Sequence, residues 1–190
     1  AAPLHALTWL RRWLALNVAA KESMACQIEG FSEMFEGRAY WELARLLPQD
    51  AILFAGNSMP VRDLDSFYPS TGQRVRFLAN RGVSGIDGVV STALGAAAAS
   101  GKRVVLVIGD ISFYHDMNGL LAAKAHKLNA TIIVLNNNGG GIFSFLPQAA
   151  YQDVFETYFG TPHGLTFKAA ADLYGLGYAK AEDWAAFRGA

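Results

Sequence analysis

The fold of this chain is decided by the stretch Arg103–Ser112, which reads RVVLVIGDIS. Its apolar, β-branched run up to Ile108 is typical of a short strand that is buried on both faces. A small polar turn follows at once, and a helical pattern begins at about Asp116. A buried strand that leads through such a turn into a helix predicts a parallel sheet with helices packed on it.

The same alternation of strands and helices extends to both sides of this stretch. Short apolar runs predict further strands at Ala51–Ala55, Val75–Ala79 and Thr131–Leu135, and a short one at Gly177–Lys180. Apolar periodicity predicts helices at residues 1–25, Gly37–Leu47, Met59–Phe67, Asp87–Ser100, Asp116–Leu128, Phe167–Leu173 and from Glu182 to Ala190. We therefore predict an α/β fold: a doubly wound, mainly parallel sheet with helices on both faces and a strand order of the 2-1-3-4-5 type.

The composition excludes several classes of protein. Sixteen Lys and Arg balance 16 Asp and Glu, which argues against a nucleic-acid binder or a protein of anionic membrane surfaces. The chain is 52% apolar and 17% charged, so it is not disordered, and no apolar run approaches the ~20 residues that span a bilayer. The single cysteine, Cys26, excludes a disulfide framework and fits a reducing, cytoplasmic compartment.

Polar turns that expose the backbone follow three of the predicted strands, at Gly56–Pro60, Gly109–Ser112 and Asn136–Gly141. The carboxyl ends of parallel strands meet at one edge of the sheet, where ligands bind in doubly wound folds. One such turn alone is more often just a tight connection. Three of them on adjacent strands predict a crevice whose backbone N–H groups can hold phosphate.

Two of these turns carry oxygen ligands suited to a hard cation. Asp110 offers a carboxylate, Asn137 an amide oxygen and Gly139 a main-chain carbonyl. One helix and one strand separate Asp110 from Asn137, which returns the chain to the same end of a neighbouring parallel strand. Because Mg²⁺ prefers a few protein oxygens completed by phosphate and water, the residues indicate a metal and diphosphate site.

The pair Gly109-Asp110 followed by Asn136-Asn137 resembles the GDG…NN signature of thiamin diphosphate enzymes, with Ile111 in place of the last glycine. Three longer strings resemble one subfamily, the 2-succinyl-5-enolpyruvyl-6-hydroxy-3-cyclohexene-1-carboxylate synthases of the menaquinone pathway. These strings are GNSMPVRD (56–63), NRGVSGIDGVVSTALGAA (80–97) and NNNGGGIFSFLPQ (136–148). The resemblance is dense over about residues 50–150 and looser on both sides.

This resemblance implies a transferase. Thiamin diphosphate, held with Mg²⁺ or Mn²⁺, would decarboxylate 2-oxoglutarate, and the resulting acyl carbanion equivalent would add to isochorismate. Residues 1–30 would be the exit helix from a preceding middle domain, and residues 31–190 a diphosphate-binding domain truncated at its C-terminus. The implied partners are an N-terminal and a middle domain of the same chain and a second subunit, in a dimer or tetramer.

The resemblance also implies roles for individual residues. Asp110, Asn137 and the Gly139 carbonyl would hold the metal, and the Gly85-Ile86 pair would meet the pyrimidine ring. The residues implied to bind the cofactor are Gly85, Ile86, Gly109, Asp110, Ile111, Ser112, Asn137 and Gly139. Those implied to bind substrate are Asn57, Ser58, Arg62 and Arg81, with an apolar wall of Ile142, Phe143 and Leu146.

No catalytic residue is predicted in this chain. Thiamin enzymes activate the cofactor with a glutamate, which in this family lies on the N-terminal domain, and no glutamate here lies in a matching motif. We therefore expect the chain alone to be inactive and to bind the cofactor weakly. The histidines His5, His115, His126 and His163 form no zinc or triad pattern, and neither they nor Cys26 are assigned a role.

Simpler interpretations remain open at this stage. Arg62 can form a helix-surface pair with Asp63 or Asp65, Arg81 can be a loop charge, and Ile142–Leu146 can be an ordinary core-facing turn. The chain can also belong to another thiamin diphosphate-dependent decarboxylase or acetohydroxyacid synthase. A third alternative is a non-catalytic, flavodoxin-like binding module that has the crevice without the chemistry.

Overall fold

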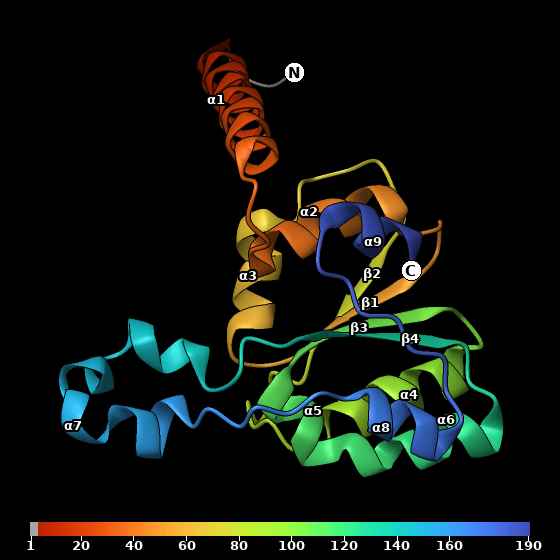
Figure 1. Cartoon of the computed structure of the whole chain (residues 1–190). Helices are drawn as coiled ribbons and strands as arrows, with labels where there is room; N and C mark the ends of the chain where they lie inside the picture. Colours follow the sequence, from red (N-terminus) through yellow and green to blue (C-terminus); the bar gives the residue numbers. More distant parts are fainter. Residues whose placement is uncertain (1–3) are drawn as a thin grey trace.

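The computed structural model describes residues 4–190, of which residues 4–6 are described only as helical backbone. Its centre is a parallel sheet with the order β2-β1-β3-β4 (Figure 1). The strands are β1 (Ile52–Ala55), β2 (Arg76–Leu78), β3 (Val104–Gly109) and β4 (Ala130–Leu135). The predicted α/β fold is confirmed, and each of these strands lies within one or two residues of its predicted bounds.

The two central strands are buried on both faces, as their continuous apolar runs predict. On one face Phe54 and Leu106 pack in a core with α4 (Val89–Ser100) and α6 (Leu120–His126). On the other face Leu53 and Val107 pack with Tyr40 of the opposite helical layer. Figure 1 shows α5 (Asp110–Asp116) and α8 (Lys168–Tyr174) in the first layer, and α2 (Glu36–Leu46), α3 (Met59–Phe67) and α9 (Trp184–Gly189) in the second.

Two predicted elements differ in the structure. The strand at Gly177–Lys180 does not form: these four residues are exposed and pair with no strand, and they lead from α8 to α9. They include no β-branched residue and no buried side chain that would favour a strand. The sheet of the described residues therefore ends at β4.

The predicted helix Asp116–Leu128 begins six residues earlier and is interrupted. It forms α5, a 3₁₀ turn (η1, Met117–Gly119) and α6. At the interruption the Asp116 carboxylate accepts hydrogen bonds from Ser91 N (2.7 Å) and Ser91 Oγ (3.0 Å). Asp116 thus caps the first turn of α4, and this contact holds α5 against that helix.

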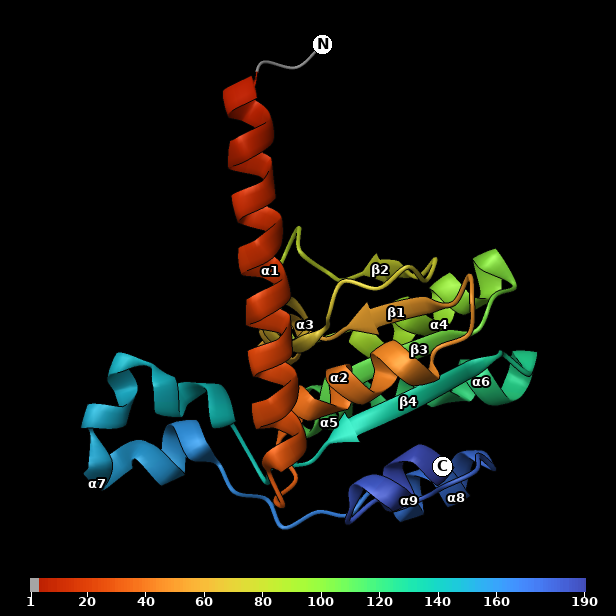
Figure 2. The ribbon, with the colours of Figure 1, turned by 90° about the horizontal axis from the view of Figure 1, so that it is seen from above.

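Two segments extend away from the sheet. The first is α1 (Leu4–Gly30), which projects away from the sheet (Figure 2). Most of its large apolar side chains, among them Trp9 and Trp13, are exposed, whereas Ile28 near its end is buried. The helix is tied to the rest of the chain at its end, where Arg38 Nη1 donates to the carbonyls of Ile28 (3.1 Å) and Phe31 (2.9 Å). The predicted helix is confirmed, and its role as an exit from another domain stays a prediction. No helix in the described part of the chain has the length and apolarity needed to cross a membrane.

The second segment, which we call the lobe, is Gly141–Gly160. It consists of η2 (Gly141–Phe145), η3 (Pro147–Ala150), α7 (Gln152–Phe155) and η4 (Glu156–Gly160). Gly140, the residue just before the lobe, donates a hydrogen bond from its N to the carbonyl oxygen of Gly160, the last residue of the lobe (2.7 Å). The lobe therefore leaves and re-enters the domain at one place, next to the end of β4 (Figure 1).

Candidate functional site

The site is centred on Asp110, which directly follows β3 and is 1% exposed. Its Oδ1 accepts a hydrogen bond from Ile111 N (2.7 Å). Its Oδ2 accepts one from Gly139 N (3.0 Å), in the turn after β4, and lies 3.1 Å from His163 Nε2. The structure thus brings two residues predicted to hold a metal together at neighbouring strand ends, as parallel strand geometry requires.

His163 is a residue of this site to which the sequence analysis gave no role. Its Nδ1 accepts a hydrogen bond from Leu165 N (2.9 Å), so a neutral ring carries its proton on Nε2 and donates it to Asp110 Oδ2. The backbone N–H groups of His163 (3.1 Å) and Gly164 (2.7 Å) donate to Asn138 Oδ1. One signal in the sequence could have found it: the residues just before α8 must lie at the carboxyl edge of the sheet, where that helix begins.

Asn137, the third predicted metal ligand, is oriented from the opposite side. Its Nδ2 donates to Oε1 of Glu36 (2.7 Å), at the first residue of α2 and 101 positions earlier in the chain. The contact to a carboxylate identifies the NH₂ end of the amide, so Oδ1 points the other way. Glu36 was also missed by the sequence analysis, because nothing in its neighbourhood marks a contact with a residue so far along the chain.

The donor chemistry of these residues fits a hard divalent cation. One carboxylate, one amide oxygen and the Gly139 carbonyl stand at the ends of β3 and β4. The Gly139 carbonyl accepts a hydrogen bond from Gly141 N (3.0 Å) and keeps a second lone pair. No group of three or more His, Cys, Asp or Glu side chains lies together for a metal within residues 7–190. A single carboxylate with neutral oxygens is the pattern expected where phosphates complete the shell of Mg²⁺.

The turn after β4 needs glycine at positions 139 and 140, because the backbone at the end of the lobe packs directly against it. Gly139 has φ +147°, a value that L side chains rarely adopt, and a Cβ there would overlap the carbonyl oxygen of Gly160. A Cβ on Gly140 would overlap the carbonyl oxygen of Phe159. The end of the lobe can therefore lie directly on the turn only because both positions lack a side chain.

The loop at residues 80–88 is fastened to two strand ends. Asn57, after β1 and 1% exposed, donates from Nδ2 to Gly85 O (2.6 Å) and accepts from Arg81 Nη1 at Oδ1 (2.9 Å). Ser112, after β3, donates from Oγ to Ile86 O (3.0 Å). Hydrogen bonds at one edge of the sheet thus join Asn57, which is predicted to bind substrate, to Gly85, which is predicted to bind the cofactor. Ser112 and Ile86, both predicted to bind the cofactor, are joined in the same way.

The two predicted substrate arginines are exposed and have no carboxylate partner among the described residues. The alternative pairing of Arg62 with Asp63 or Asp65 is absent, and Arg62 Nη1 instead donates to Ser58 O (2.7 Å). Ser58 precedes α3 with φ +69° and ψ −132°, a strained conformation for a residue with a side chain. Strain of this kind concentrates at functional sites, which agrees with the predicted role of the turn.

Asp63 faces inward, is 5% exposed, and its Oδ2 has no hydrogen-bond partner among the described residues. Burial, and then the negative charge of Glu36, raise the pKa of Asp63 from 3.8 to about 6. Burial, and then Asp63, also raise the pKa of the Tyr40 hydroxyl. This buried carboxylate belongs to α3, in the helical layer next to the site, and its protonation affects the stability of the fold.

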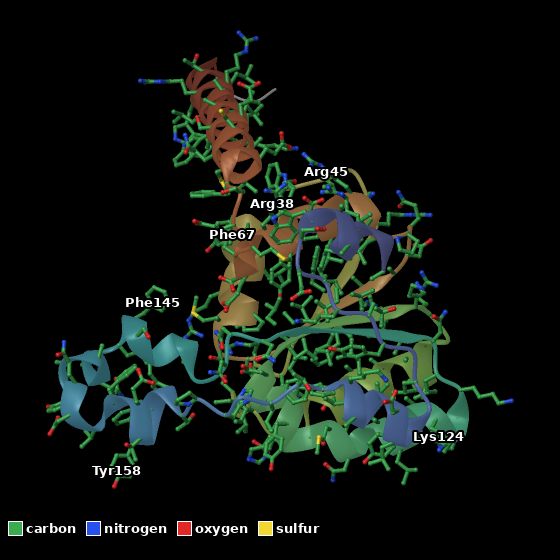
Figure 3. The ribbon with its side chains drawn as sticks, in the orientation of Figure 1. Arg38, Arg45, Phe67, Lys124, Phe145 and Tyr158 are labelled. Atoms are coloured by element: carbon green, nitrogen blue, oxygen red, sulfur yellow. The ribbon has the colours of Figure 1, made fainter. Side chains whose placement is uncertain are left out.

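The predicted apolar wall lies in the lobe. Phe143 packs there on Phe159, with ring centroids 5.5 Å apart, while Phe145 and Tyr158 point outward on opposite sides (Figure 3). The packing of Phe143 agrees with the simpler interpretation of a core-facing turn, and the substrate role of Ile142, Phe143 and Leu146 stays a prediction. A separate groove of about 540 Å³ is lined by α1, residues 31–35 and Phe67 of α3, and no predicted site residue lines it.

The fold and this site define the class of protein. Residues 62–189 match the family described as the thiamine pyrophosphate enzyme, C-terminal TPP binding domain, and the chain belongs to that family. Thiamine pyrophosphate is another name for thiamin diphosphate. The class predicted from the Asp110 and Asn137 motifs is therefore confirmed.

Particular relatives narrow the comparison. The chain is 56% identical over 180 residues to the 2-succinyl-5-enolpyruvyl-6-hydroxy-3-cyclohexene-1-carboxylate synthase of Geobacillus thermodenitrificans, which is 95% of this chain and 30% of that protein. It is 52% identical over 174 residues to the synthase of the same name from Listeria welshimeri, covering 92% of this chain and 30% of that protein. The chain thus spans about 30% of the length of these curated relatives.

A solved structure shares the fold. It comes from Mycobacterium smegmatis and is described as a thiamin diphosphate-dependent enzyme. It superposes with a TM-score of 0.64 at 27% sequence identity, over 82% of this chain and 28% of that chain. The resemblance to one subfamily of thiamin diphosphate enzymes, made on three sequence strings, is confirmed by the 56% and 52% identity to the two synthases above.

Proposed function

We propose that this chain is the metal- and diphosphate-binding domain of a thiamin diphosphate-dependent synthase. The whole protein would decarboxylate 2-oxoglutarate and add the remaining four-carbon unit to isochorismate. The observation that carries the proposal is the hydrogen bond between Asp110 Oδ2 and Gly139 N, which brings the two signature turns together. The similarity to synthases that are 49–56% identical supports this particular reaction.

Asp110, Asn137 and the Gly139 carbonyl would hold Mg²⁺ or Mn²⁺ against the diphosphate. Asp110 supplies the one negative charge, and its burial leaves little water to compete for that charge. Asn137 is held by Glu36 with its amide oxygen pointing away from that carboxylate. The backbone N–H groups of Ile111 and Ser112 would bind phosphate oxygens, with Ile111 N leaving its present acceptor, Asp110 Oδ1, to do so. The Ser112 hydroxyl would keep its hydrogen bond to Ile86 O.

Thiamin diphosphate, when bound, supplies the chemistry that breaks the bond between the carbonyl carbon and the carboxylate of a 2-oxo acid. The chain supplies position. Gly85 and Ile86 would contact the pyrimidine ring, and their carbonyls are fixed by Asn57 and Ser112. A loop fastened at two strand ends keeps its shape, which is what orienting a bound cofactor requires.

Arg62 and Arg81 would bind the carboxylates of the substrates. Both guanidinium groups are exposed and free of ion pairs within the described residues, and both are anchored at the edge of the sheet through Ser58 and Asn57. A guanidinium group can bind a carboxylate through two parallel hydrogen bonds, which suits substrates that carry several carboxylates.

The chain would need further parts to act. Glu36 is the glutamate that contacts the site, and it accepts a hydrogen bond from Asn137. Within residues 7–190, no other glutamate is hydrogen-bonded to a residue of the site. An activating glutamate on a preceding domain, assembly with a second subunit and a cytoplasmic location are parts of this proposal. A different thiamin diphosphate-dependent decarboxylase or acetohydroxyacid synthase remains its alternative.

A chimera tests the proposed reaction. This chain would replace the matching 180 residues of the Geobacillus thermodenitrificans relative, to which it is 56% identical. With thiamin diphosphate and Mg²⁺, we expect the chimera to consume 2-oxoglutarate and isochorismate, and the 190-residue chain alone to consume neither. Arg62→Ala and Arg81→Ala should raise the KM for these substrates. Preference for pyruvate would contradict the proposal and favour the acetohydroxyacid synthase alternative.

A further inference from the structure

His163 forms the least expected contact of the site. It reaches Asp110 from 53 residues further along the chain, and its side chain is 16% exposed against 2% for Asp110. Its ring is held on several sides: Leu165 N donates to Nδ1, and Phe167 packs at 6.1 Å between ring centroids. Its backbone N–H is bound by Asn138 Oδ1. The imidazole therefore presents Nε2–H to the carboxylate in a fixed direction.

The hydrogen bonds to Asp110 are unequally distributed between its two oxygens. An ionised carboxylate has about four acceptor positions, two on each oxygen. Oδ2 receives two N–H donors, from Gly139 and His163, whereas Oδ1 receives one, from Ile111. The acceptor position that remains is on Oδ1, and the three donors together fix the plane of the carboxylate.

We propose that His163 is a positioning residue of the metal site: it donates from Nε2 to Asp110 Oδ2 and holds the carboxylate with Oδ1 open to the cation. This inference rests on the proposed function. His163 acts through Asp110 and does not itself bind the metal. A donor hydrogen-bonded to a ligating carboxylate orients that ligand, as an acceptor does for a ligating imidazole, and losing such a partner typically lowers metal affinity by about 10- to 100-fold.

The position of His163 also links the metal site to the lobe. The chain returns from the lobe at Gly160, whose carbonyl accepts from Gly140 N, and reaches His163 three residues later. Asn138, in the turn that carries the metal ligands, accepts from the backbone of both His163 and Gly164. The segment after the lobe is therefore bound to the ligand turn at the backbone and to Asp110 by the imidazole.

Two substitutions separate positioning from packing. His163→Phe keeps a ring against Phe167 and removes the donor, whereas His163→Gln can place an amide N–H near the position of Nε2. His126→Phe, at the exposed end of α6, is the matched control for a histidine-to-phenylalanine change. The probe is Mn²⁺ with inorganic diphosphate, and bound metal is measured by electron paramagnetic resonance. Urea unfolding of each variant shows whether it is folded.

We expect His163→Phe to weaken Mn²⁺ binding by about 10-fold or more, His163→Gln to recover most of it, and His126→Phe to leave it unchanged. In the metal-free protein, ¹⁵N resonances of the His163 ring should show protonated Nε2, and Asp110→Ala should shift that resonance.

Unchanged or tighter binding by His163→Phe, or equal losses in both His163 variants, would overturn the inference. If wild type nevertheless binds Mn²⁺ and Asp110→Ala does not, the proposed metal site stands and only the role of His163 is disproved. If wild type binds no Mn²⁺, the proposed metal site fails and this inference fails with it.

Discussion

Arg81 donates from Nη1 to Asn57 Oδ1 at 2.9 Å, which joins two residues that the sequence predicts to bind substrate. Asn57 uses the other end of its amide to bind Gly85 O at 2.6 Å, so both of its polar atoms are engaged. Through these two hydrogen bonds, Asn57 fixes the loop at residues 80–88 to the end of β1. Arg81 is therefore positioned by a buried, neutral side chain. Its positive charge is not paired with a carboxylate among the described residues and can bind an anionic ligand.

Asn57→Asp should destabilise the protein by about 2 kcal/mol, because a carboxylate oxygen would replace the donor to Gly85 O inside a buried site. The free energy of unfolding in urea measures this. Asn118→Asp, at an exposed position before α6, is the control and should change stability by less than about 0.5 kcal/mol. Equal effects at the two positions would show that the amide of Asn57 is not held as described.

Asp63 should make the stability of the protein fall as the pH rises. Its pKa is 3.8 in an ordinary environment and about 6 in the folded chain, mainly through burial. Below about pH 4 both states are protonated; between about pH 4 and 6 the folded state keeps a proton that the unfolded state has released, so stability declines. Above pH 6 the loss is complete and amounts to about 2–3 kcal/mol.

Asp63→Asn should remove this penalty. We expect the variant to be more stable than wild type by about 2 kcal/mol at pH 8 and equal to it at pH 3, measured by urea unfolding. Asp65→Asn, on the exposed side of the same helix, should show no such dependence. A gain for Asp63→Asn that is equal at both pH values would contradict a titration in this range.

Ser58→Gly should stabilise the protein by about 1 kcal/mol, since glycine adopts positive φ without the strain that a Cβ imposes. Ser66→Gly, exposed in the last turn of α3, should instead destabilise it by about 0.5 kcal/mol. The difference in thermal midpoint between the two variants tests the prediction. A loss of stability in Ser58→Gly would mean that the serine side chain supports this turn by more than its conformation costs.

Gly139→Ala should disrupt the ligand turn, because φ is +147° and a Cβ would overlap Gly160 O. We expect a loss of more than about 2 kcal/mol in stability, or local opening seen as faster hydrogen exchange at residues 139–165. Gly95→Ala, in the middle of α4 with open space around its Cα, should stabilise by about 0.5–1 kcal/mol. A tolerated alanine at position 139 would show that the lobe does not close on the turn.

The layered sheet was predictable because its central strands are buried on both faces and leave a continuous apolar signal, as in Val104–Ile108. Helix α3 begins and ends where the pattern predicts, at Met59 and Phe67. Gly177–Lys180 misled the prediction because a four-residue run gives no periodicity with which to tell a strand from a loop.

The candidate site was predictable only where its residues follow strand ends, as Asp110 and Gly139 do. His163 contacts Asp110 from 53 residues away along the chain, and Glu36 contacts Asn137 from 101 residues away. Partners so distant in sequence leave no local pattern. Helices in the lobe were not predicted, since its turns are short and pack mainly on one another, as Phe143 does on Phe159.

Calorimetric titration of thiamin diphosphate into the 190-residue chain tests the central claim most directly. Wild type, Asp110→Ala and the exposed control Asp153→Ala would each be titrated with Mg²⁺ and with a chelator. We predict that wild type and Asp153→Ala bind thiamin diphosphate weakly, and only when Mg²⁺ is present. Asp110→Ala should remain folded and bind no thiamin diphosphate. Binding that is equally strong with the chelator, or that Asp110→Ala retains, would contradict a metal-dependent diphosphate site at the ends of β3 and β4.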